Sequence, residues 1–246
     1  MENVDKLPRL NGLSLGYDWP WLGGMAALLL LYLLFGTTRL QADASRSRWR
    51  DRTWLAWAAV CIYLAHNIEE YGIDALGRRY EFPAMMDKIF TGAVALPPNA
   101  FYLAANIGIV WVALPIAALV SKRHPLVGLA GYSVMALNLL THLGALFVVG
   151  YNPGLLTAVG LFLPMTIWIA RALFGAGKMA YEGFAVVIIA GIVLHAILIG
   201  SMFSYVHGLI SSGIFVAFQI LNAALLLVVL WIGERVLGER LYRKAA

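Results

Sequence analysis

The segment AHNIEEYG, residues 65–72, places one imidazole and two carboxylates at the end of a long apolar run. His66, Glu69 and Glu70 stand at positions i, i+3 and i+4, so in a helix their side chains project from one face, and Tyr63 lies on the same stripe. A carboxylate alone in hydrocarbon becomes protonated unless a cation balances its charge. Imidazole nitrogen with carboxylate oxygen suits zinc or iron, so the pattern predicts a metal site.

Polar residues of other apolar segments are predicted at the same depth. Asn138 and His142 are four residues apart and share a helix face, and Asn106 and His195 each lie in a further apolar run. With a rise of about 1.5 Å per residue, His66, Asn106, His142 and His195 fall within a layer roughly 10 Å thick in the outer half of a bilayer. We therefore expect one closed polar pocket to be formed by several helices.

The expected roles follow from residue chemistry. The predicted metal ligands are His66, Glu69, Glu70, His142 and His195. Glu70 is a ligand or the general base, with Glu69 as a second catalytic carboxylate. For His195, a helix–helix hydrogen bond is an equal alternative. Residues expected to orient the ligands or to line the substrate pocket are Asn138, Asn106, Tyr63 and Tyr151.

The composition is that of a membrane protein. The 246 residues are 61% hydrophobic and only 13% charged, and the mean hydropathy is +0.79. Soluble domains are about 25% charged. The net charge of +5 is no nucleic-acid signal, because the basic residues lie between apolar runs. Cys61 is the single cysteine and excludes both an internal disulfide and a cysteine-rich metal site.

The apolar runs predict an all-α transmembrane bundle that forms a single domain, residues 1–246. A hydrocarbon core of about 30 Å requires roughly 20 helical residues. The connection 72–98 alternates apolar and charged residues at roughly helical spacing, which favours an interfacial helix or a lid. The seven expected spans are about 19–38, 53–71, 99–120, 125–149, 153–171, 183–203 and 208–233.

The basic residues predict the orientation. With the N-terminus outside and the C-terminus inside, most of the 18 lysine and arginine residues fall in inner segments. Such a bias is typical of cytoplasmic loops. The basic residues left outside are Lys6, Arg9, Arg78, Arg79 and Lys88.

The motif HNIEE, residues 66–70, resembles that of the HXXEE family of bacterial integral membrane proteins. The segment 138–164, NLLTHLGALFVVGYNPGLLTAVGLFLP, is similar to a second signature of that family. This signature has an Asn, a His four residues later, and a Tyr-x-Pro-Gly turn. The resemblance covers roughly 53–171. It implies that His66, Glu69, Glu70, Asn138 and His142 belong to one site, and it supplies no reaction.

The sequence predicts a membrane-embedded metalloenzyme that acts on a lipid or other apolar substrate, through a metal-activated water, with Zn or Fe as cofactor. A non-haem iron oxidase or hydroxylase is one alternative, and a proton- or cation-coupled transporter that uses the same cluster is another. A retinal photoreceptor is excluded because the last span has no lysine. The expected location is the cell (inner) membrane, with no nucleic-acid partner. The oligomeric state stays open.

Overall fold

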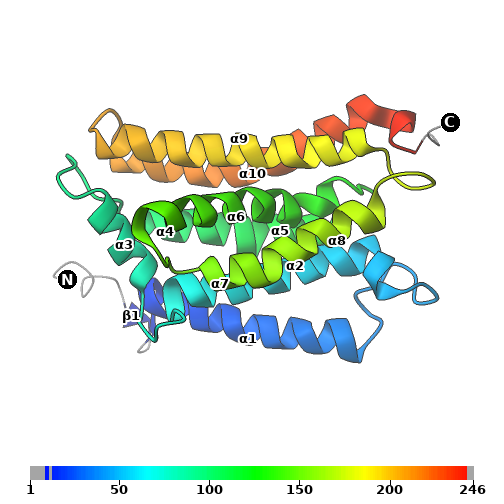
Figure 1. Ribbon diagram of the computed structural model, residues 1–246, viewed down its shortest axis with the longest axis horizontal. Helices are drawn as coiled ribbons and strands as arrows, with labels where there is room; N and C mark the ends of the chain where they lie inside the picture. Colours follow the sequence, from blue (N-terminus) through cyan, green and yellow to red (C-terminus); the bar gives the residue numbers. More distant parts are fainter. Residues whose placement is uncertain (1–8, 11–12, 243–246) are drawn as a thin grey trace.

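The computed structural model describes residues 9–10 and 13–242, and it shows long helices lying side by side with nearly parallel axes (Figure 1). A small antiparallel hairpin, formed by β1 and β2, precedes the first helix. The described chain begins at one end of the bundle and finishes at the opposite end. Such an arrangement is expected for an odd number of spans.

The elements follow one another along the chain with these bounds. The strands and helices are β1 Arg9–Leu10, β2 Leu13–Ser14, α1 Leu15–Gly36, α2 Arg52–Asn67, α3 Glu81–Ile89, α4 Asn99–Asn106, α5 Leu114–Val120, α6 Ala130–Val149, α7 Leu155–Thr157, α8 Leu163–Leu173, α9 Tyr181–Val206 and α10 Ser212–Leu237. Three π-helical segments, η3 Ile68–Gly72, η4 Ile107–Ala113 and η6 Ala158–Phe162, continue α2, α4 and α7. Three 3₁₀ turns, η2 Arg48–Arg50, η5 Val127–Leu129 and η7 Gly238–Tyr242, lie at helix ends.

Six helices in the described part of the chain are long and apolar enough to cross a membrane. The seventh element along the bundle is α2 with η3, whose polar last turns lower its hydropathy. The predicted all-helical membrane fold with about seven spans is confirmed. The six helices are Asp18–Gly36, Asn99–Val120, Val127–Val149, Leu155–Leu173, Tyr181–Val206 and Ser212–Tyr242.

Helix α2 is buried on most of its surface and packs against α1, α5 and α6. Asp51 is its N-cap residue, and the Asp51 carboxylate accepts a hydrogen bond from the Trp54 backbone N–H at 2.9 Å, which caps the first turn. Small residues bring α6 close, because a Cβ at Gly131 would lie 2.5 Å from the Cβ of Ala59. The buried Cys61 thiol donates to the Ala27 carbonyl of α1.

The π-helical segments all begin directly after a polar residue. η3 follows Asn67, η4 follows Asn106, and η6 follows Thr157. A π-helical turn contains one more residue than an α-helical hydrogen-bonded turn, so it changes the direction of the side chains that follow, and such segments are frequent at functional sites.

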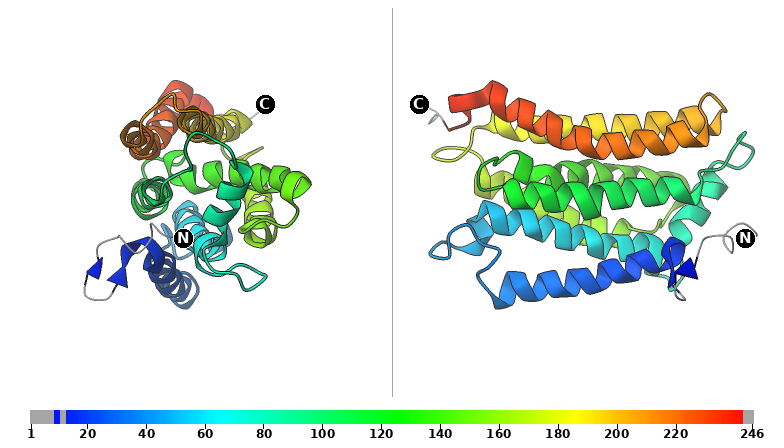
Figure 2. Two further views of the ribbon diagram at one scale, coloured as in Figure 1. Left: turned by 90° about the vertical axis from the view of Figure 1, so that its left-hand side faces the viewer. Right: turned by 180° about the vertical axis from the view of Figure 1, so that it is seen from behind.

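Helix α3 lies across one end of the bundle, in front of the other helices in the left view of Figure 2. Arg78 anchors the chain before α3 through Asp74 at 2.7 Å and Glu81 at 3.1 Å, and Lys88 adds a contact to Glu81 at 3.2 Å. Burial raises the pKa of Asp74, but hydrogen bonds from Arg78 and the Leu76 N–H outweigh it and hold the pKa below its usual value.

Candidate metal centre

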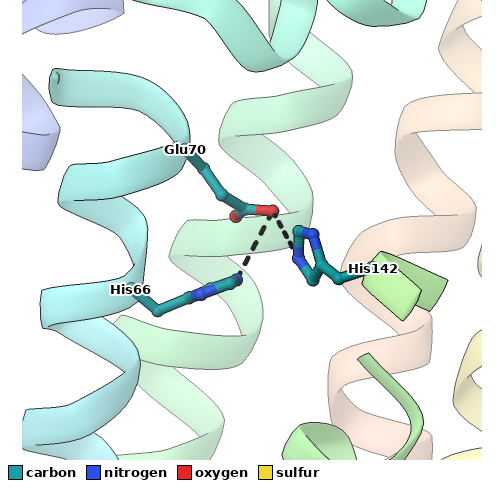
Figure 3. A group of neighbouring side chains, drawn as sticks. All are labelled: His66, Glu70 and His142. Atoms are coloured by element: carbon teal, nitrogen blue, oxygen red, sulfur yellow. Dashed lines mark ion pairs between the residues drawn. The ribbon is translucent and has the colours of Figure 1, made fainter. Parts of the chain in front are cut away.

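Two histidines and one glutamate converge inside the bundle (Figure 3). His66 comes from α2, Glu70 from η3 and His142 from α6. Glu70 Oε1 lies 3.5 Å from His66 Nε2 and 3.4 Å from His142 Nε2. One ligand atom from each of the three residues lies within 4.8 Å of the others. The three side chains are almost wholly shielded from solvent.

The His142 ring is oriented by Asn152. The amide nitrogen of Asn152 donates to two backbone carbonyls, those of His142 and Gly150. Its oxygen therefore faces His142 Nδ1, at 2.6 Å. An oxygen acceptor at this distance requires a proton on Nδ1, so the neutral ring carries its lone pair on Nε2. That nitrogen is buried and has no hydrogen-bond partner among the described residues.

The His66 ring is oriented in the same sense by Thr157. The Thr157 hydroxyl lies 2.6 Å from Glu69 Oε2 and 3.1 Å from the Gly154 carbonyl, so its single proton goes to an acceptor. Towards His66 Nδ1, at 2.7 Å, the hydroxyl oxygen therefore accepts. His66, like His142, carries its lone pair on Nε2 and directs it at Glu70.

Two imidazole lone pairs and a carboxylate oxygen repel one another unless a positive charge lies between them. A proton shared with Glu70 would give a charge-assisted hydrogen bond, which is about 2.7–2.9 Å long. The observed separations of 3.4 and 3.5 Å are too long for that bond. Two ligands of one tetrahedral ion with bonds of about 2.0–2.2 Å lie roughly 3.3–3.6 Å apart. The spacing therefore fits a metal ion better than a proton.

Glu69 does not join this group, in contrast to the prediction from helical phase. Its two oxygens accept hydrogen bonds from the Leu156 and Thr157 N–H groups, the Thr157 hydroxyl and the Tyr151 hydroxyl. The Leu156 and Thr157 donors lie at the N-terminus of the span 155–173, where the helix dipole favours an anion. Glu69 is thus directed at the neighbouring helix, and through Thr157 it orients His66.

The turn 150–154 closes the site on one side. Gly154 has φ +93°, and a Cβ there would lie 2.6 Å from His142 Cε1, 2.7 Å from His66 Cε1 and 2.9 Å from Glu70 Cγ. No other residue fits this position. Tyr151 joins this turn to the connection between η3 and α3, because its hydroxyl accepts a hydrogen bond from the Ala75 backbone N–H. Partial burial, together with the Glu69 carboxylate, raises the pKa of Tyr151 to about 12, so the hydroxyl stays a donor.

Tyr63, which was expected on the same helical stripe as His66, and Asn138 of α6 both lie beside the His66 ring. The Asn138 amide nitrogen donates to the Tyr63 hydroxyl at 2.6 Å and lies 3.5 Å from His66 Nε2. Thr141 donates to the Asn138 side-chain oxygen, which fixes the direction of the amide. A weak N–H donor thus faces the His66 lone pair.

A cavity of about 280 Å³ adjoins the cluster. Glu70 and His142 form part of its wall, together with residues of α3, α4, α6 and α9. His195 lines the same cavity from α9 but lies outside the three-residue group. Asn106 also lines it, while its amide donates to the Tyr102 carbonyl of its own helix at 2.9 Å.

Thr157, Asn152 and Gly154 were not predicted as site residues. Asn152 and Gly154 belong to the Asn-Pro-Gly turn, which reads as a simple helix connection in the sequence. Thr157 is a lone hydroxyl in an apolar run, and its role depends on contact with residues 69 and 66. One signal was available in the sequence. Asn152 and Gly154 lie in the turn that follows the His142 span, and Thr157 lies at the start of the next span, so all three were expected near the same end of the bundle as His142.

Comparison with known protein families matches the middle of the chain. Residues 57–169 match the profile of a family described as "Protein of unknown function with HXXEE motif". The matched region contains the three converging residues and the turn that closes over them. No curated protein and no solved structure matches the chain. The resemblance noted in the sequence is confirmed by this match.

Proposed function

We propose that this chain, whose residues 57–169 are an HXXEE-family segment, is a membrane-embedded metalloenzyme acting on a lipid or other apolar substrate. The ligands are His66, Glu70 and His142, and the metal is zinc or iron. The observation that carries the proposal is the convergence of two oriented Nε2 lone pairs on one Glu70 oxygen beside a largely apolar cavity. Its proposed location is the cell (inner) membrane, with the site in the outer half of the bilayer.

The ligand set is narrower than the one predicted from the sequence. Glu69 is fully engaged by four donors, so its role is to position His66 through Thr157. His195 lines the cavity outside the three-residue group, so its proposed role is a substrate contact. Two histidines with one carboxylate are the protein ligands of several catalytic zinc sites, which keep a further position open for water.

Hydrolysis is the leading reaction. A divalent ion with three protein ligands lowers the pKa of a bound water to about 7. With the ion held by His66, Glu70 and His142, Glu70 would serve both as a ligand and as the base. It would accept the proton of the attacking water as the water oxygen bonds to the acyl carbon of the substrate. It would return that proton to the leaving oxygen or nitrogen as the bond from the acyl carbon to the leaving group breaks.

The donor set also supports an iron oxidase or hydroxylase. Two histidines and one carboxylate with open positions form the ligand arrangement of non-haem Fe(II) oxygenases. This reaction would require molecular oxygen and an external electron donor. The two reactions are distinguished by the source of the oxygen in the product. Hydrolysis introduces oxygen from ¹⁸O-labelled water, and hydroxylation introduces it from ¹⁸O₂.

The first experiment is metal analysis of the purified protein after incubation with Zn²⁺ or Fe²⁺ and removal of free metal. We expect about one ion per chain in the wild type, and loss of the ion in His66→Ala, Glu70→Gln and His142→Ala. His207→Ala is the matched control, because His207 is exposed and hydrogen-bonded to its own helix.

A wild-type protein that retains no metal under these conditions would overturn the metal centre. Proton flux in liposomes that is abolished by Glu70→Gln, in a protein without metal, would establish the transporter alternative instead.

A further inference from the structure

The cavity beside the cluster has a lining that restricts its ligand. Its walls include the apolar face of α3, formed by Phe82, Met85, Met86 and Ile89. These residues follow helical i, i+3, i+4 and i+7 spacing, so one face of the helix covers the cavity. A hydrocarbon chain matches such an apolar lining.

Charge excludes an anionic head group. Glu70 is the only Asp, Glu, Lys or Arg among the described residues that line the cavity. Glu70 and the hydrogen-bonded Glu69 together balance a divalent ion, so the centre is neutral as a whole. An anion placed in the cavity would have no compensating lysine or arginine, and its burial would be costly. The ligand is therefore neutral.

His195 supplies a polar contact in the same cavity from α9. Its Nδ1 lies 2.9 Å from the Gly191 carbonyl, which only accepts, so Nδ1 carries the proton. The lone pair is on Nε2, which has no hydrogen-bond partner among the described residues. The ring is 9% exposed and lines the cavity. A ligand that completes this site presents an O–H or N–H donor to Nε2.

The cavity reaches the side of the bundle between α6 and α9. These helices are in close contact at Gly191, where a Cβ would overlap the Ser133 carbonyl. Further along the same helices, Thr141 and Ile199 line the cavity and are also exposed. Both residues belong to helices apolar enough to cross a membrane. A ligand can therefore enter sideways from the lipid.

We propose that the cavity binds a neutral, single-chain amphiphile whose head group carries a hydroxyl or an amide N–H. The chain lies against α3, and the donor of the head group bonds to His195 Nε2 beside the metal centre. This assignment rests on the proposed metalloenzyme in two respects. The bound metal ion balances the charges of Glu69 and Glu70, and the enzyme activity makes the bound amphiphile a substrate. The apolar lining and the His195 acceptor stand independently of it.

The test uses the full chain in lipid nanodiscs and a tetradecanol probe that carries a photoreactive diazirine in its chain. We expect the probe to label peptides of α3 and α9. Excess 1-tetradecanol should suppress the labelling at about tenfold lower concentration than 1-methoxytetradecane or tetradecanoate. A tenfold difference in affinity corresponds to about 1.4 kcal/mol of binding free energy. His195→Leu should remove the preference for the alcohol over the ether, and His207→Leu should keep it. Met86→Trp, which fills the cavity, should reduce labelling.

Equal competition by the ether in the wild type would overturn the role of His195, and equal competition by tetradecanoate would overturn the neutral head group. Metal content is measured in the same samples. Metal without alcohol preference would refute the substrate assignment alone, whereas alcohol preference without metal would refute the proposed metal centre alone.

Discussion

At the scale of single residues, Gly154 lies over the two imidazoles with a backbone that favours glycine. We predict that Gly154→Ala lowers metal affinity at least tenfold, because the added Cβ would overlap both rings and Glu70. The measurement is Zn²⁺ titration of the metal-free protein against a chelator. Gly150→Ala is the control, since Gly150 also has a positive φ, +75°, but nothing lies within 4 Å of its Cβ position.

If Gly154→Ala binds Zn²⁺ as tightly as Gly150→Ala, the turn does not close over the metal ligands. The comparison separates the two costs of a side chain at this position. Both variants place a side chain at a positive φ, since Gly154 has φ +93° and ψ −14° and Gly150 has φ +75° and ψ −145°. Only Gly154→Ala adds the overlap with the cluster.

Thr157 connects Glu69 to His66 through one hydroxyl. We predict that Thr157→Val, which keeps the shape but loses the hydroxyl, lowers metal affinity about 10- to 100-fold, the range for loss of a group that orients a metal ligand. Thr157→Ser should restore most of the affinity. The same chelator titration gives the result. Equal affinities of the Val and Ser variants would show that His66 needs no acceptor at Nδ1.

At the scale of elements, the sequence predicted where the helices lie better than where their side chains point. Apolar runs near the length of a bilayer determine the spans, and this signal is local. Glu69 and Glu70 have different partners within the π-helical segment η3, because the N-terminus of the span 155–173 binds Glu69 while Glu70 lies beside His66 and His142.

The last span shows the same limit. It was predicted to begin at 208, and α10 begins at Ser212, after a turn in which Gly208 has φ +74°. Hydropathy alone did not separate this turn from the helix, since Leu209 and Ile210 are apolar. The hydrogen bonds of Thr157 and Asn152 were equally inaccessible, because each depends on how distant segments pack.

The connection before α3 is held by Asp74, and this gives a pH prediction. The pKa of Asp74 is lowered in the folded protein, so its stabilisation is complete above its unfolded value of about 3.9 and is lost as the pH falls through the folded value. At pH 7, Asp74→Asn should cost about 1–2 kcal/mol. The difference from the wild type should shrink at pH 3.

Thermal unfolding midpoints of both proteins at the two pH values test this prediction. Asp43→Asn is a useful comparison, because the Asp43 side chain is 45% exposed and its bonds are local. A difference between wild type and Asp74→Asn that is unchanged at pH 3 would contradict the assigned ionisation.

At the scale of the whole molecule, the two ends of the bundle differ in charge. Basic side chains of the segments 39–52, 122–123 and 235–240 lie at one end, and α3 covers the other. With the basic end inside, a membrane-impermeant maleimide should label Thr91→Cys in intact cells. Ala44→Cys should react only after lysis. Reaction of Ala44→Cys in intact cells would reverse the predicted orientation.

The buried thiol of Cys61 also has a practical consequence for physical studies. Since it is the only cysteine of the sequence and is packed between α1 and α2, the native chain can serve as its own unreactive background. Pairs of cysteines introduced at chosen sites can then carry spin labels or fluorophores without first removing a native cysteine. Distances across the opening between α6 and α9 become measurable by spectroscopy in an otherwise unaltered protein.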